Sequence, residues 1–71
     1  MQVREVMSRD VRIAAPEDTI ASAARAMSEI DSGVLPVGEN DRLIGIITDR
    51  DIALRAIGQG LGPDAPVRDV M

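Results

Sequence analysis

The sequence predicts a small α/β (α+β) domain in which two helices pack against a three-stranded sheet, in the order strand, helix, strand, strand, helix. Apolar residues recur with a helical spacing of three and four within residues 20–30 and again within 51–57. Two short apolar segments, 34–37 and 42–48, are separated by a polar turn, which is typical of an antiparallel hairpin. Residues 11–13 alternate between apolar and polar, as a half-buried strand does.

The first predicted strand, Val11-Arg12-Ile13, leads into a helix start at Pro16–Thr19. Asp18 is the expected N-cap, because its carboxylate can accept hydrogen bonds from the free N–H groups of the first turn. Gly33 is expected to end this helix in a left-handed conformation. The apolar face of the helix is expected to comprise Ile20, Ala23, Ala24, Met27 and Ile30.

The hairpin is expected to consist of Val34–Val37, a turn at Gly38–Asp41 and a second strand at Arg42–Thr48. Pro36 suits an edge strand or a bulge, because proline cannot donate to a sheet ladder. A second helix is predicted at Asp51–Ile57, with an apolar face formed by Ile52, Ala53, Ala56 and Ile57. The glycine-rich segment 58–62 follows that helix and lacks the Lys and Ser/Thr of a phosphate-binding loop, so we interpret it as a linker.

Composition limits the chemistry that the chain can perform. Its 71 residues suffice for one domain, and they include no His, Cys, Phe, Tyr or Trp. Disulfides, histidine or cysteine zinc sites and histidine-based proton transfer are therefore excluded. Without aromatic residues the core must be thin, and small folds of this kind commonly require a partner surface. We expect at least a dimer.

Charge and hydropathy narrow the partners and the location. The net charge of −4 disfavours nonspecific binding to nucleic acid, which depends on clustered basic residues. The N-terminal residues lack the apolar segment of a signal peptide, and no apolar run approaches the roughly 20 residues of a membrane span. The expectation is a soluble, cytoplasmic protein with neither a nucleic-acid nor a membrane partner.

The junction Gly45–Ile52 (Gly-Ile-Ile-Thr-Asp-Arg-Asp-Ile) contains the most informative residues. Here a strand runs into a helix, and the hydroxyl of Thr48 and the carboxylate of Asp51 lie beside free backbone N–H groups. Such a helix start suits phosphate and ribose groups. The same two residues approximate a capping box, and Asp51 can pair with Arg55 one turn later. Spacing alone leaves both interpretations open.

A second pattern spans the chain: Val3-Arg4-Glu5-Val6-Met7 recurs as Val67-Arg68-Asp69-Val70-Met71. Together with the junction, this echo makes the chain resemble a single CBS (cystathionine-β-synthase) domain, most like small bacterial proteins made of two tandem CBS domains. The motifs that carry the resemblance are Val6-Met7, Pro16–Thr19, Gly33–Val37, Gly45–Ile52 and Val67–Met71.

The resemblance implies a regulatory module that senses adenine nucleotides (AMP, ADP, ATP or S-adenosylmethionine), as in energy sensing, without a prosthetic group or catalysis. In the family two copies pack sheet against sheet, ligands lie in clefts between them, and such pairs often associate further. The resemblance assigns phosphate contact to Thr48 and ribose contact to Asp51. It assigns the base pocket to Ile13, Val34, Leu35 and Pro36.

Only one copy is present, which departs from the paired family pattern. Residues 1–66 are expected to form the single CBS domain, and residues 67–71 to be the truncated start of a second repeat. The cleft would then form across a homodimer or a higher oligomer.

Each candidate residue also has a structural interpretation. Gly45 can permit close ligand approach, or mark a bulge or tight packing. Pro36 can shape the base pocket or protect a strand edge. Arg50 can offset phosphate charge or remain solvated at the helix start.

Two other function classes follow from these alternatives. One is a ligand-free dimerisation or interaction domain. The other is an enzyme in which Asp49 and Asp51 hold a metal, which the absence of His, Cys, Lys and Tyr disfavours.

Overall fold

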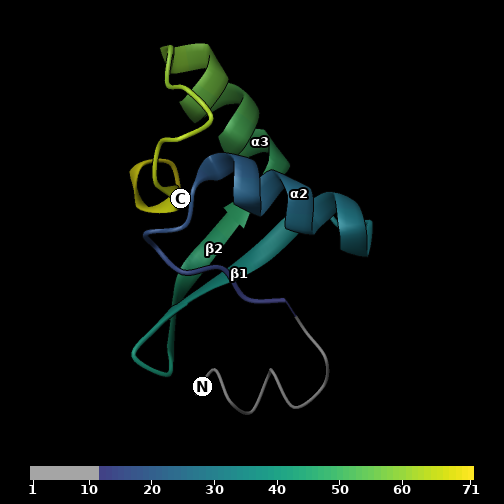
Figure 1. The fold of residues 1–71 in the computed structure, drawn as a ribbon, viewed down its shortest axis with the longest axis vertical. Helices are drawn as coiled ribbons and strands as arrows, with labels where there is room; N and C mark the ends of the chain where they lie inside the picture. Colours follow the sequence, from purple (N-terminus) through teal and green to yellow (C-terminus); the bar gives the residue numbers. More distant parts are fainter. Residues whose placement is uncertain (1–11) are drawn as a thin grey trace.

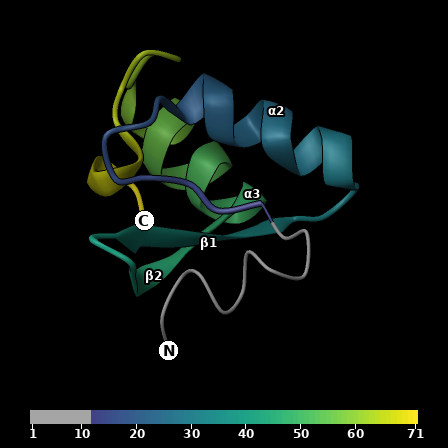
Figure 2. The same ribbon diagram turned by 60° about the horizontal axis from the view of Figure 1, so that its bottom comes forward.

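The computed structural model describes residues 12–71, and within them two helices cover one face of a β-hairpin (Figures 1 and 2). Helix α2 spans Ile20–Ile30, strand β1 Val34–Glu39 and strand β2 Arg42–Thr48. Helix α3 begins at Asp49–Asp51 and continues as a π-helical segment, Ile52–Ala56, and a 3-10 turn, Ile57–Gln59. A last 3-10 turn spans Val67–Asp69. This mixed arrangement confirms the predicted α+β class.

The hairpin forms where the alternation of residues indicates it. Leu35 pairs with Ile47 and Val37 with Gly45, and a bulge follows between Val37 and Gly38. Asn40 and Asp41 both have positive φ angles, 53° and 63°, which matches the twist of a tight hairpin turn. Strand β2 has its predicted bounds, whereas β1 continues two residues beyond the predicted segment.

The predicted third strand reduces to a single bridge in the part of the chain that is described. The Ala14 N–H donates to the Pro36 carbonyl (2.9 Å), and the Gly38 N–H donates to the Ala14 carbonyl (2.8 Å). Val11 lies outside the described residues. The pairing stops because Pro16, two residues later, has no N–H and begins a turn. The sheet therefore has two strands across residues 12–71, and the prediction of three strands was wrong there.

Both caps of α2 differ from those expected. Thr19 is the N-cap and accepts the Ser22 N–H (3.1 Å), whereas Asp18 accepts the Ala15 N–H (2.9 Å) and closes the preceding turn. At the other end Asp31, not Gly33, adopts the left-handed conformation, with φ of 54°. Its N–H bonds to carbonyls of the last helical turn, which ends the helix two residues earlier than expected.

The core lies between the helices and the inner face of the hairpin. It takes Leu35 and Val37 from β1, Ile47 from β2 and a narrow stripe from α2, which leaves Ala24 and Ile30 exposed. The buried apolar residues are Ala14, Ile20, Ala23, Met27, Leu35, Val37, Ile47, Ala56, Val67 and Val70.

The second helix starts earlier than predicted and changes its winding. Thr48 is its N-cap, so the helix begins at Asp49 instead of Asp51. The Ile57 N–H bonds to the carbonyls of both Ala53 and Ile52, which marks the wider π turn. That turn displaces the helical register, so Ile57 is 67% exposed although its spacing predicts burial. Within residues 12–71, no helix combines the length and apolar character needed to cross a bilayer.

The C-terminal residues pack into this same core. Val67 and Val70 are fully buried, and the Val67 N–H donates to the Asp18 carbonyl (2.8 Å). Whether 67–71 also begins a second repeat stays a prediction.

Candidate functional site

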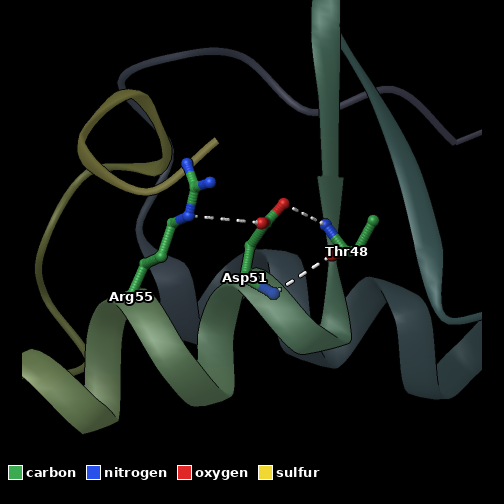
Figure 3. Close-up of polar contacts among 3 residues, drawn as sticks. All are labelled: Thr48, Asp51 and Arg55. Carbon is green, nitrogen blue, oxygen red and sulfur yellow. Dashed lines mark hydrogen bonds and ion pairs between the residues drawn. The ribbon is translucent and has the colours of Figure 1, made fainter.

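The strand-to-helix junction forms a complete capping box (Figure 3). Thr48 Oγ1 accepts the Asp51 N–H (3.0 Å), and Asp51 Oδ2 accepts the Thr48 N–H (3.0 Å). Aspartate here fills the position that glutamate or glutamine usually takes. The structural interpretation of these two residues is therefore realised, and a ligand role would be additional to it.

Both side chains retain hydrogen-bonding capacity beyond the cap. A threonine hydroxyl has one donor and two acceptor sites, and the cap uses a single acceptor site. Asp51 Oδ1 lies 3.8 Å from Arg55 Nε, as the expected i,i+4 pair, and the carboxylate side chain is 21% exposed. Thr48 can therefore donate to an anion while Asp51 accepts from hydroxyl groups.

The outer face of the hairpin, which points away from the helices, is apolar. Alternation along the strands places Val34, Pro36 and Ile46 on this face, opposite the buried Leu35 and Ile47. The register pairs Val34 with Thr48 and Pro36 with Ile46, so the apolar residues lie beside the capping box. We refer to Val34, Pro36, Ile44 and Ile46 as the outer sheet face.

The structure brings together five of the seven predicted site residues. Val34, Pro36 and Thr48 share the outer side of the hairpin, and Asp51 is joined to Thr48 through the cap. Ile13 is half-buried and precedes the bridge at Ala14, which places it next to Pro36 by strand alternation.

The remaining two predicted residues lie apart. Leu35 is 1% exposed and faces the core, so its side chain is unavailable to a ligand on the outer sheet face. Arg50 is exposed at the helix start, with no ion pair to another described residue.

The glycine at position 45 has a packing explanation. A Cβ atom built there would lie 2.5 Å from Cε of Met71, on the inner side of the sheet. The tight-packing interpretation therefore accounts for Gly45. Gly33 has a similar constraint, since a Cβ there would lie 2.7 Å from Asp49 Oδ2.

Sequence reasoning did not include Ile44 and Ile46 among the candidate site residues, although they lie on the outer sheet face. Both are exposed, at 47% and 55%. The signal was present, because they alternate with Gly45 and Ile47 along β2 and therefore share the face of Thr48. Among residues 12–71 no group of three or more carboxylates is placed to hold a metal ion.

Comparison with known proteins identifies the family. The CBS domain model matches residues 3–58. The CBS domain-containing protein YhcV of Bacillus subtilis is 42% identical over 69 residues, which cover 97% of this chain and 49% of YhcV. Hypoxic response protein 1 of Mycobacterium tuberculosis is 40% identical over 62 residues, which cover 86% of this chain and 43% of that protein.

Solved structures agree with this result. A CBS domain protein from Pyrobaculum aerophilum, complexed with AMP, superposes with a TM-score of 0.71 at 26% identity, covering 99% of this chain and 55% of that one. The chain spans about half the length of the curated relatives that it matches. On the match over residues 3–58 and the shared fold, the chain belongs to the CBS domain family.

Proposed function

We propose that this CBS domain binds an adenine nucleotide in a cleft formed by its outer sheet face and a second CBS unit, and that it acts as a regulatory module without catalysis. The observation that carries the proposal is the capping box beside an exposed apolar face, in a fold that an AMP-complexed neighbour shares. The ligand class comprises AMP, ADP, ATP and S-adenosylmethionine.

The apolar part of the site suits a purine. Val34 and Ile46 are about half exposed, and Pro36 lies between Ile46 and Ile13 across the strands. An adenine ring laid on this face would remove apolar surface from water, at about 25 cal/mol per Å². Binding at an apolar wall with a few convergent polar groups is the usual arrangement of small-molecule sites.

The polar part suits ribose and phosphate. Asp51 Oδ1 is not used by the cap and can accept ribose hydroxyls, which is the role that the family resemblance assigns to it. The Thr48 hydroxyl can donate to a phosphate oxygen while it continues to accept the Asp51 N–H. Arg50, two residues after Thr48, supplies a positive charge that offsets the phosphate.

A second CBS unit supplies the other wall. In residues 12–71 the helices cover only the inner side of the hairpin, so Val34, Ile44 and Ile46 stay exposed (Figure 2). A two-fold related copy that buries this face would make the cleft and enlarge the thin core. The proposal therefore includes assembly of the chain into a homodimer or higher oligomer, and a role in energy sensing in the cytoplasm.

The alternative is a ligand-free dimerisation domain. The complete capping box favours it, because the cap alone explains Thr48 and Asp51. Under this alternative the outer sheet face still pairs two copies, but the cleft has no ligand.

Calorimetric titration of the full chain with AMP and adenosine, comparing Thr48→Val with Thr48→Ser, tests the proposal. Thr48→Ser keeps the hydroxyl and should bind AMP like the parent chain. Thr48→Val should weaken AMP about tenfold or more, because hydrogen bonds to charged groups contribute about 1.5–3 kcal/mol, yet leave adenosine affinity unchanged. ADP, ATP and S-adenosylmethionine are titrated into the parent chain in the same way, and if none of these ligands and no AMP binds, the dimerisation alternative remains.

A further inference from the structure

The C-terminal residues Val67–Met71, here called the clasp, pack into the domain. The site that they occupy, here called the seat, comprises the space over Gly45, the carbonyls of Pro16 and Asp18, and the carboxylates of Glu17 and Glu39. Val67 and Val70 are fully buried, and Met71 lies over Gly45, where a Cβ would come within 2.5 Å of its Cε. The absence of a side chain at position 45 therefore leaves the space that the Met71 side chain uses. The seat admits three apolar side chains from one turn of chain.

Polar contacts fix the same turn. Arg68 Nη2 pairs with Glu17 and lies 3.7 Å from Glu39 Oε2, so one carboxylate from the turn before α2 and one from the end of β1 face a single guanidinium. The N–H groups of Val67 and Arg68 donate to the carbonyls of Asp18 (2.8 Å) and Pro16 (3.0 Å). Asp69 is exposed. The seat therefore contacts four of the five clasp side chains, and the side chain of Asp69 is the exception.

The first copy of the motif, residues 3–7, has the same residues as the clasp at the four positions that contact the seat. Val3, Arg4, Val6 and Met7 are identical to the four clasp residues that contact the seat. The one difference is Glu5, which corresponds to the exposed Asp69. The two copies therefore differ only at the position whose side chain is exposed in the clasp, so the first copy has every side chain that the seat contacts. The chain therefore contains two copies of the motif and, within residues 12–71, one seat.

We propose that this seat is an exchangeable docking site, and that Val3–Met7 of a second copy of the chain binds there in place of Val67–Met71. This interface is separate from the outer sheet face, because the seat lies on the inner side of Gly45 and along loop 16–18. It does not depend on a nucleotide. The clasp competes with Val3–Met7 of a second chain and has the advantage that it belongs to the same chain as the seat. Exchange is therefore favoured where two chains are already held together, because both segments then have a high effective concentration at the seat.

The absence of cysteine permits a direct test by cross-linking. Two single-cysteine full-length chains, Met7→Cys and Gly45→Cys, are mixed and treated with a short bismaleimide, and the products are mapped by mass spectrometry. Circular dichroism first confirms that each variant is folded. The added Cβ at position 45 meets only the flexible end of Met71, so the seat can accept it.

The proposal predicts a covalent heterodimer that joins residue 7 of one chain to residue 45 of the other. Glu5→Cys in place of Met7→Cys is the matched control, and should give little heterodimer because that position corresponds to exposed Asp69. Adding Val3→Ser or Val6→Ser to the Met7→Cys chain should lower the yield about tenfold each, or about 1.4 kcal/mol, because each substitution removes an apolar side chain that the seat would bury. Equal yields from Met7→Cys and Glu5→Cys, or no effect of the serine substitutions, would overturn the proposal.

Discussion

Replacement of Asp51 by alanine or by glutamate separates its capping role from its proposed ligand role. Asp51→Ala removes the acceptor of the Thr48 N–H and the partner of Arg55. Asp51→Glu keeps a carboxylate at the third helical position, where glutamate is the preferred capping-box residue. The same change moves the carboxylate by one methylene relative to a ribose placed on the outer sheet face.

The expected magnitudes follow from these contacts. Loss of one part-buried hydrogen bond costs about 1 kcal/mol, and the exposed i,i+4 pair adds a few tenths. In a domain of this size a loss of about 1 kcal/mol lowers Tm by about 4–8 °C. Asp51→Glu should stay within about 0.5 kcal/mol of the parent chain. Nucleotide at about 100 times its Kd should stabilise the parent chain by about 2.7 kcal/mol.

Thermal unfolding followed by far-ultraviolet circular dichroism, with and without AMP, measures both effects. The chain has no aromatic residue, so intrinsic fluorescence offers no signal. We expect Asp51→Glu to keep the Tm of the nucleotide-free protein and to lose most of the shift that AMP produces. A full AMP shift in Asp51→Glu, or in Asp51→Ala, would refute the ribose assignment and leave Asp51 as a cap.

Three further substitutions test other parts of the structure. Val70→Ala should lower the free energy of unfolding in urea by about 2 kcal/mol, whereas Asp69→Ala should change it by less than about 0.5 kcal/mol; equal effects would contradict the burial of the clasp. Gly33→Ala should cost about 1 kcal/mol, and Asp49→Ala should relieve that cost in a double-mutant cycle; additive effects would contradict the contact. Ile46→Glu should leave the domain folded but monomeric in light scattering, and a persistent dimer would contradict pairing through the outer sheet face.

Local patterns predicted the hairpin and the junction well. The alternation in 42–48 gave the bounds of β2, and the Thr48–Asp51 spacing gave the capping box because both depend on neighbouring residues. The same alternation also predicts which residues of β2 lie on the outer sheet face.

The incorrect predictions concern features that depend on contacts between residues distant in sequence, or on two residues that compete for the same cap position. Asp18 and Thr19 are both good N-caps, and Thr19 took the position because Asp18 closes the turn to Ala15. Gly33 looked like a helix terminator, but its small size serves the approach of Asp49 from the start of the second helix.

Winding and strand length were also beyond local reasoning. The π turn at Ile52–Ala56 cannot be read from apolar spacing, which assumes a regular helix. The third strand reduces to the bridge at Ala14 because Pro16 ends the pairing. Leu35 was assigned to the base pocket through family resemblance, and its face of the sheet became visible only from the register with Ile47. Whether 67–71 also begins a second repeat is independent of its burial in this core.

Native mass spectrometry of the full chain, with and without a mixture of AMP, ADP, ATP and S-adenosylmethionine, tests whether the ligand site forms between two CBS units, because it reports assembly and bound mass together. We predict a dimer or higher oligomer that carries adenine ligand, and ligand-free monomer for Ile46→Glu under the same conditions. A dimer that remains empty with all four ligands, or nucleotide bound to the Ile46→Glu monomer, would contradict a ligand site formed between two CBS units.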